Sequence, residues 1–311
     1  LGRMWFGTLE GLGCYDGNSM TVYKPSSEPT RNFLGNEIHN LVSDKQGNIF
    51  FTSDNVLIHY DLHKEQFSPL QRKVNCLHAQ GHTVWAATQD SVFKWNPAKK
   101  QFAFVYRLKP SQYITSLYSD TNDCLWLGTS RGLYRIDNLA TPTPVCVIAE
   151  VNVHSLYRDT KGRMWVAAFR QGMYKIENGI SQKFVIEKDF ALSNNDVRCF
   201  VEDSEGSIWI GTFNGLNKID TAGNVSYYKK DTQPGNLKHS SIFSLYKDSQ
   251  GTIWAGTYYG GVQYFNPQMD FFRHYSEDAD RTDCLSFFFV GNMAEDKRGD
   301  IWICTEGGGL N

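Results

Sequence analysis

The chain has 311 residues, a length that suits either two ordinary domains or one long repeat fold. Hydrophobic residues make up 41% of it and charged residues 21%, which is typical of a folded protein with a core. The formal net charge is -2 and the basic residues are scattered, so we expect no nucleic acid partner for this segment. No apolar run approaches the roughly 18 residues that cross a bilayer, and the first residues lack a signal-peptide pattern. We therefore expect membrane contact only through regions downstream of this chain.

The cysteines are odd in number and show neither C-x-x-C pairs nor the spacing of zinc ligands. Several of them occupy motif positions that small or apolar residues fill elsewhere in the chain. The sequence therefore predicts free, buried thiols and no metal site built from cysteine.

One motif, of the form D-x-x-G-x-I-W-x-G-T-x-x-G-L-x-x-Y-D, returns along the whole chain. Its central aromatic positions are separated by roughly 35 to 48 residues, the range of four-stranded propeller blades. They are Trp5, Phe50, Trp85, Trp126, Trp165, Trp209, Trp254 and Trp302. Helical repeats would need a hydrophobic period of 3.6 residues, which is absent here.

The clearest copy contains four segments of strand length, at 241–248, 250–257, 261–266 and 269–275. A four-stranded unit cannot bury both of its faces alone, so a ring of such units supplies the core. The sequence thus predicts an all-β fold, a β-propeller of about seven four-stranded blades. The alternatives are eight blades, or the start of a second propeller at the C-terminus.

The first motif copy lacks its innermost strand, and the apolar segment 287–290 is a candidate to close that blade. We accordingly expect a seven-bladed propeller over 1–295, with 296–311 as a closing strand or the start of a following propeller. Both ends of the chain fall inside a motif copy, which predicts a fragment of a longer protein.

Two motif positions are expected to be structural. The aspartate that opens each motif suits a tight turn, because it can accept hydrogen bonds from nearby backbone N–H groups before a glycine. A small residue two positions after the aromatic, such as Gly211 or Ala167, suits close approach of neighbouring sheets.

These motifs resemble the propeller repeats in the periplasmic sensor regions of hybrid two-component system proteins, bacterial regulators of polysaccharide use. The resemblance covers essentially the full chain. It is carried by the opening run 2–12 (G-R-M-W-F-G-T-L-E-G-L) with Tyr15-Asp16-Gly17, and by the linkers 192–197 (L-S-N-N-D-V) and 234–237 (P-G-N-L). The second copy departs from the pattern, since no Gly-Leu follows Phe50.

The resemblance implies an extracytoplasmic, ligand-sensing propeller in the periplasm, part of an inner-membrane protein that carries a histidine kinase. Such proteins bind oligosaccharide or polysaccharide fragments, control polysaccharide-utilisation genes and act as homodimers. The segment itself is then expected to be non-catalytic, with no cofactor.

The motif also resembles the Asp-box of sialidases, so a sialidase-like glycosidase is an alternative. Candidate arginines are Arg131, Arg170 and Arg198, but no sequence signal joins them to the Tyr/Glu pair of such an enzyme. We predict no catalytic residue. His39 and His154 fall at matching positions on innermost strands, where packing is favoured over a metal site because no carboxylate or cysteine recurs at ligand spacing.

In a propeller, the loops from second to third strands and from fourth to first strands emerge on one face. Flat aromatic rings and fixed polar groups on such loops suit a carbohydrate, and arginines can pair with a uronate or sulfate. The predicted ligand-binding residues are Glu10, Asp90, Arg131, Phe169, Arg170, Phe213, Asn214, Tyr258, Tyr259 and Glu306. A protein-interaction scaffold that uses the same residues is the remaining alternative.

Overall fold

The computed structural model describes residues 2–25, 33, 35–44, 46–120, 124–184, 192–230, 237–267, 290–295, 297–298, 301–305 and 309–310. Every regular element in these ranges is a β-strand, which confirms the predicted all-β class. The chain divides into two compact units, Leu1–Tyr264 and Phe265–Asn311. The part of the chain that the structure describes contains no helix able to span a membrane.

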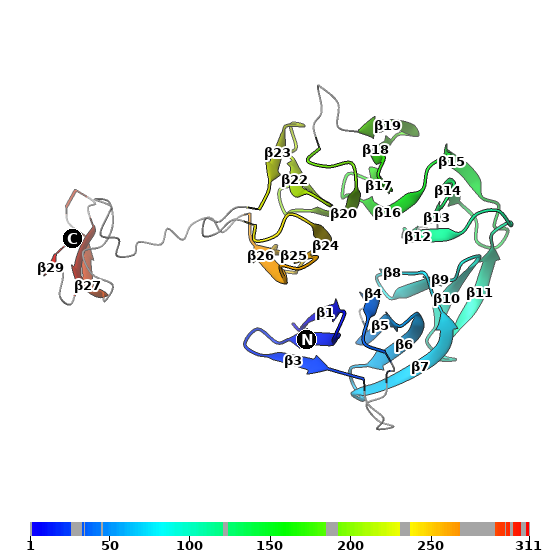
Figure 1. Cartoon of the computed structure of the whole chain (residues 1–311), viewed down its shortest axis with the longest axis horizontal. Coiled ribbons are helices and arrows are strands. Elements are labelled where there is room, and N and C mark those ends of the chain that lie inside the picture. The colour runs from blue at the N-terminus through cyan, green and yellow to red at the C-terminus, as the bar shows by residue number, and fades with distance from the viewer. Residues whose placement is uncertain are drawn as a thin grey trace. The chain divides into compact units, whose positions relative to one another are not determined.

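The first unit is a seven-bladed β-propeller, as predicted, with seven antiparallel sheets arranged around a common centre (Figure 1). Its blades follow one another in chain order. Blades 1 to 3 contain β1 (Met4–Thr8), β2 (Gly11–Tyr15) and β3 (Met20–Tyr23); β4 (Ile38–Ser43), β5 (Asn48–Ser53), β6 (Val56–Asp61) and β7 (Gln66–Lys73); and β8 (Cys76–Gln80), β9 (Thr83–Ala87), β10 (Ser91–Asn96) and β11 (Gln101–Arg107).

Blades 4 to 7 continue the same order. They contain β12 (Ile114–Ser119), β13 (Leu125–Thr129), β14 (Gly132–Ile136) and β15 (Val145–Ala149); β16 (Val153–Arg158), β17 (Met164–Ala168), β18 (Gly172–Glu177) and β19 (Ile180–Phe184); β20 (Val197–Glu202), β21 (Ile208–Thr212), β22 (Gly215–Ile219) and β23 (Val225–Tyr228); and β24 (Ile242–Lys247), β25 (Ile253–Thr257) and β26 (Val262–Phe265). The first strands of neighbouring blades contact one another from β4 to β24, so they line the centre of the ring.

Among the described residues, blade 1 has three strands, and its β1 carries Trp5, the motif aromatic residue that lies on the second strand of the other blades. The described part of the first copy thus lacks an innermost strand, as predicted. The segment proposed to close this blade lies outside the described residues at 287–289. Val290 begins β27 (Val290–Glu295), which pairs with β28 (Ile301–Thr305) and, through it, with β29 (Gly309–Leu310). The expected boundary at 295 stays a prediction.

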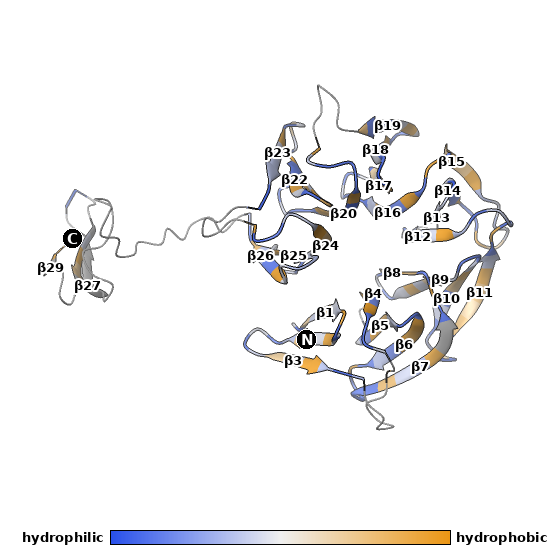
Figure 2. Cartoon of the chain, viewed as in Figure 1, coloured by the Kyte–Doolittle hydropathy of each residue, from blue (hydrophilic) through white to orange (hydrophobic). Residues whose placement is uncertain are grey.

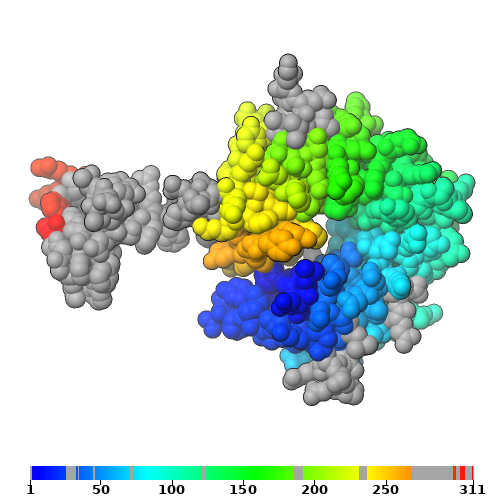
Figure 3. All heavy atoms as spheres, in the orientation of Figure 1, coloured from blue at the N-terminus to red at the C-terminus, as the bar shows by residue number. Residues whose placement is uncertain are grey.

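In most blades the aromatic residue of the motif packs against the next blade. Trp165 of blade 5, for example, shares a buried cluster with Phe200 and Ile208 of blade 6. The same contact joins the last blade to the first, because Trp254 lies 5.9 Å from Phe6 between ring centroids. Figure 3 shows these two blades side by side. Hydrophobic residues concentrate in the strands and hydrophilic residues in the loops (Figure 2). The ring is thus held by one repeated inter-blade core.

The motif aspartates have the predicted role in turns. Asp203 Oδ1 accepts hydrogen bonds from the backbone N–H groups of Glu205 and Ser207, at 3.0 and 2.9 Å. Its Oδ2 accepts a hydrogen bond from the indole Nε1 of Trp209 at 2.9 Å. The aspartates that precede Trp165 and Trp254 accept the same indole bond. In blades 5, 6 and 7 the spacing D-x5-W therefore joins the turn to the motif tryptophan, whereas in blade 4 Asp120 pairs with Arg158 and Trp126 Nε1 has no hydrogen-bond partner among the described residues.

The small residue after the aromatic allows close approach of neighbouring blades, as predicted. A Cβ atom on Gly211 would lie 2.7 Å from Ile242 Cγ2 on the inner strand of the next blade. The described cysteines are free, and Cys14 and Cys76 are buried. The prediction of burial is wrong for Cys146 and Cys304, which are exposed, while Cys284 lies outside the described residues. Cys146 lies on β15, the outermost strand of its blade, where one sheet face reaches solvent.

Candidate ligand-binding face

Backbone hydrogen bonds place the loops between second and third strands against the connections between blades. The N–H groups of Ser130, Phe169, Phe213 and Tyr258 donate to carbonyls of the segments that lead into β12, β16, β20 and β24, at 2.8 to 3.1 Å. Both sets of loops therefore share one face, as the sequence predicts. We call the surface formed by these loops on blades 3 to 7 the loop face.

A β-bulge begins the inner strand of blades 4 to 7 and turns one side chain out of the ladder. The pairing register shifts at the second residue of β12, β16, β20 and β24. A bulge of this kind leaves its extra residue unpaired and re-aims the side chain. The residues concerned are Thr115, His154, Arg198 and Phe243.

Arg198 lies at the centre of a group of aromatic rings. Its guanidinium carbon lies 4.9 Å from the ring centroid of Phe213 and 5.4 Å from that of Phe243. Phe243 stacks on Tyr258 at 6.3 Å, and Tyr258 meets Tyr259 edge-on at 4.4 Å. We call these five residues the aromatic cluster. Its rings are unusually open to solvent, with 52% of Phe213, 54% of Phe243 and 78% of Tyr259 exposed.

The arginine of the cluster is fixed by polar contacts from its own blade and the next. Arg198 Nη2 lies 3.4 Å from Asp196 Oδ2, and Nη1 donates to Ser241 Oγ at 3.1 Å. The other carboxylate oxygen of Asp196 is buried and has no hydrogen-bond partner among the described residues. A charge-paired arginine between two rings orders the cluster before any ligand arrives.

Blade 5 extends this surface. The Arg170 guanidinium lies 5.0 Å from the ring centroid of Phe169, and the His154 ring lies 6.2 Å from the same ring. Loss of water around the His154 imidazole lowers its pKa below 6.5, while the carboxylate of Asp196 opposes this shift and Arg198 adds to it. Arg170 also has a φ of +56°, a left-handed conformation that is uncommon for a residue other than glycine.

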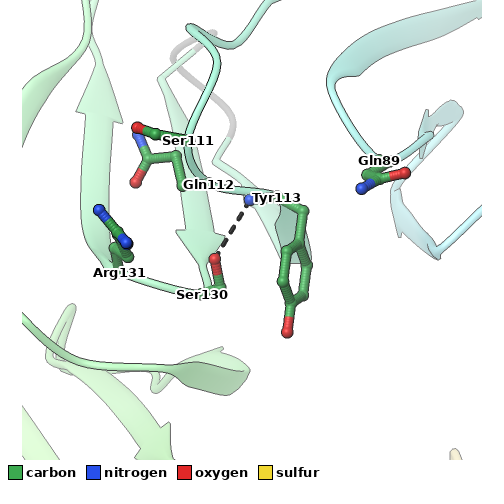
Figure 4. Close-up of a pocket in the computed structure, with 6 residues that line it drawn as sticks. All are labelled: Gln89, Ser111, Gln112, Tyr113, Ser130 and Arg131. Carbon is green, nitrogen blue, oxygen red and sulfur yellow. Dashed lines mark hydrogen bonds between the residues drawn. The ribbon is translucent and has the colours of Figure 1, made fainter.

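A polar pocket of about 440 Å³ opens between blades 3 and 4 on the loop face (Figure 4). Tyr113 and Ser130 join its two sides, since Tyr113 N donates to Ser130 Oγ at 3.2 Å and Ser130 N donates to the Tyr113 carbonyl at 2.9 Å. The residues that line it are Gln89, Ser111, Gln112, Tyr113, Ser130 and Arg131. Amides, hydroxyls and one guanidinium offer both donors and acceptors to a ligand.

The structure brings some of the predicted residues together. Phe213, Tyr258 and Tyr259 belong to the aromatic cluster, Phe169 contacts Arg170, and Arg131 lines the pocket.

Other predicted residues lie apart from these groups. Asp90 pairs with Arg107 at 3.1 Å, and a hydrogen bond from Ser91, followed by the charge of Arg107, lowers the pKa of its carboxyl. Glu10 and Asn214 are exposed loop residues whose backbone N–H groups bond to a threonine. Glu306 lies outside the described residues. The binding role of all these residues stays a prediction.

The prediction from loops alone omitted the bulged inner-strand residues. One motif position on the inner strands is shared by Arg198, Phe243 and His154, and alignment of these strands shows it. The β-bulge at this position cannot be recognised from the sequence. The expectation that His154 is a packed inner-strand residue is wrong in part, because the residue is exposed, although its ring lies 6.2 Å from that of Phe169. Among the described residues, no group of three or more His, Cys, Asp or Glu side chains is placed to hold a metal ion.

A family model matches three segments of this chain. The family model described as two component regulator propeller matches residues 109–131, 191–214 and 236–259, each of which leads into the first two strands of a blade. A search of curated proteins found no match.

Several solved structures are similar to this chain at low identity. The extracellular domain of a putative hybrid two component system from B. thetaiotaomicron is 20% identical with a TM-score of 0.46, over 99% of this chain and 61% of that one. Virginiamycin B lyase from Staphylococcus aureus is 13% identical with a TM-score of 0.56, and the match covers 88% of this chain and 93% of the lyase. PorZ, a surface component of the type-IX secretion system of Porphyromonas gingivalis, is 14% identical with a TM-score of 0.56, and the match covers 85% of this chain and 49% of PorZ.

The chain spans 55% to 61% of the length of the B. thetaiotaomicron domains. Blades 4, 6 and 7 contain the matched segments. This chain is therefore a β-propeller that carries two-component regulator propeller repeats, as its motifs predict.

Proposed function

We propose that this propeller binds a glycan fragment on its loop face and does not turn it over. The observation that carries the proposal is the exposed aromatic cluster around Arg198, on two neighbouring blades of the matched family repeats. Aromatic rings cover the apolar C–H side of a sugar, and fixed polar groups bond its hydroxyls. Each of these rings contacts another member of the cluster, so a ligand need order few side chains on binding.

In this proposal the chain is the extracytoplasmic, periplasmic sensor part of a homodimeric inner-membrane protein with a histidine kinase, which controls polysaccharide-utilisation genes. The family match supports the signalling part of the proposal. Coupling to the kinase requires a conformation or dimer geometry that the ligand-bound propeller prefers.

The ion pair between Asp196 and Arg198 favours a binding function over catalysis. Glycoside hydrolysis generally uses two carboxyl groups on either side of the scissile bond. Asp196, the carboxylate of this cluster, is paired with Arg198 and thereby serves as its counter-ion. A sialidase-like glycosidase remains the enzymatic alternative, and release of chromophore from a chromogenic glycoside would establish it.

A protein-docking scaffold is the second candidate. Exposed Phe and Tyr side chains next to an arginine are also the residues that dominate binding at protein interfaces. The two functions differ in ligand, because only the sensor responds to a soluble oligosaccharide.

Thermal unfolding of the 311-residue chain with a panel of neutral, uronic and sulfated oligosaccharides tests the proposal. A ligand that binds only the native state stabilises it by about 2.7 kcal/mol at 100 times its Kd, so the midpoint rises. The variant Phe213→Ala should reduce that rise, with affinity about 10-fold lower. Phe104→Ala is the matched control, since Phe104 is 61% exposed on the outer strand β11. No rise with any sugar would favour the scaffold.

A further inference from the structure

We propose that the ligand of the loop face is acidic and that Arg131 and Arg170 bind its carboxylate or sulfate groups. This inference rests on the proposed function and adds the charge of the ligand to it. Both arginines follow the second strand of their blades, β13 and β17, and both are exposed. They therefore present two guanidinium groups from neighbouring blades to the same face.

On blades 3 to 7, ion pairs distinguish these two arginines from the others. Each of five further arginines lies within ion-pair distance of a carboxylate: Arg107 of Asp90, Arg135 of Asp137, Arg158 of Asp120, Arg163 of Asp159 and Arg198 of Asp196. Arg131 and Arg170 form no ion pair with any acidic side chain that the structure describes. Two guanidinium groups without a protein counter-ion are available to an anion from outside.

One short segment holds both arginine loops. The Glu150 N–H donates to the Arg131 carbonyl at 3.0 Å, and the Phe169 N–H donates to the Asn152 carbonyl at 2.8 Å. Residues 150–152 thus connect the backbone of the Arg131 loop to that of the Arg170 loop. Because both loops are hydrogen-bonded to the same three-residue segment, the backbones that carry the two arginines are held next to each other on the loop face.

The Arg170 side chain packs on the ring of the preceding residue, Phe169. Its guanidinium lies over the Phe169 ring, and its backbone has a φ of +56°. Left-handed conformations at residues other than glycine carry a cost and are found preferentially at functional sites. Glu150, at a φ of +57°, and Ser111, at +96° on the wall of the pocket, share this conformation on the same face.

The pocket around Arg131 offers hydrogen-bonding groups to an acidic sugar. Gln89, Gln112 and Ser130 offer amide and hydroxyl groups to the ring hydroxyls of a sugar (Figure 4). The planar guanidinium matches the two oxygens of a carboxylate or a sulfate ester. A uronic acid and a sulfated sugar share this chemistry.

The test measures binding of three oligosaccharides of equal length, one neutral, one uronic and one sulfated, to the whole chain by isothermal titration calorimetry. The variants are Arg131→Gln, Arg170→Gln and the double variant. Arg135→Gln is the control, because Arg135 lies in blade 4 beside Arg131 but is paired with Asp137 at 2.7 Å. Thermal unfolding of each variant checks that it folds.

The expected result is that at least one acidic ligand binds about 10-fold or more tightly than the neutral one. Each single Arg→Gln change on the loop face should remove about 10-fold of that affinity, while the neutral ligand and the Arg135→Gln variant are unaffected. Equal binding of neutral and acidic ligands, or folded loop-face variants with unchanged affinity, would overturn the inference and leave the proposed function standing. Binding of no sugar at all would overturn both.

Discussion

Asp203 Oδ2 accepts a hydrogen bond of 2.9 Å from the indole Nε1 of Trp209, six residues later in the chain. The same carboxylate closes the turn between β20 and β21 through Oδ1. Asp203 is 3% exposed and Trp209 is 4% exposed, so both ends of the bond are out of water. The bond joins the local conformation of a turn to the burial of the motif tryptophan.

Replacing Asp203 with Ala should therefore be strongly destabilising. The change leaves the Trp209 indole and two backbone N–H groups without their acceptor, and we expect a loss of about 2–4 kcal/mol in the free energy of unfolding. Urea denaturation measures it. Asp220→Ala is the control, because Asp220 accepts similar backbone bonds from Ala222 and Asn224 in an exposed turn with no indole partner. A loss at Asp220 as large as at Asp203 would contradict this account.

A comparison of two tryptophans isolates the indole hydrogen bond. Trp126 is buried like Trp209 and also lies under a cation, Arg135 at 5.6 Å, but its Nε1 has no hydrogen-bond partner among the described residues. Trp→Phe removes the same volume at both sites. We expect Trp209→Phe to cost about 1–2 kcal/mol more than Trp126→Phe, since it leaves Asp203 Oδ2 without its donor. Equal losses in urea denaturation would show that the bond adds nothing beyond packing.

The turns and blades could be predicted from sequence because their causes are local. Asp203 lies four residues before the N–H of Ser207 that it binds and six before Trp209, so the whole arrangement is contained in one motif. The missing inner strand of blade 1 followed in the same way from the position of Trp5.

The binding face was predicted only in part because its contacts join different blades. Arg198 and Phe243 are 45 residues apart in number, yet the guanidinium lies 5.4 Å from the ring, a distance fixed by the bulges of β20 and β24. The counter-ion of Asp90, Arg107, is likewise on another strand, β11. Spacing along the chain carries no information about such pairs.

The close approach of neighbouring blades gives a third prediction. A Cβ atom on Gly211 would lie 2.5 Å from Cys199 Sγ and 2.7 Å from Ile242 Cγ2, so Gly211→Ala should cost about 1–3 kcal/mol. Gly256 holds the same position in blade 7, where the described part of the next blade has no inner strand, and among the described residues its Cβ would meet only Ser244 Oγ at close range. A hydroxyl can rotate away, so Gly256→Ala should be milder. The reverse order in thermal unfolding would contradict the close-approach explanation.

The fourth prediction concerns stability at acid pH. Burial lowers the pKa of His78 to about 4 from an ordinary value of 6.5, and its Nε2 is buried without a hydrogen-bond partner among the described residues. As the pH falls below 6.5, His78 becomes protonated in the unfolded chain but stays neutral in the native state until the pH approaches 4. The unfolded state is thereby favoured, and this residue lowers the free energy of unfolding by about 3 kcal/mol once the pH reaches 4.

Urea denaturation at several pH values between 7 and 4 checks this prediction through its slope. His78→Asn removes the titrating group, so its free energy of unfolding should depend less steeply on pH than that of the unaltered chain, whatever its value at pH 7. Burial also lowers the pKa of His59, so part of the slope should remain. If the slopes of the His78→Asn variant and the unaltered chain coincide, native His78 takes up its proton as readily as the unfolded chain does.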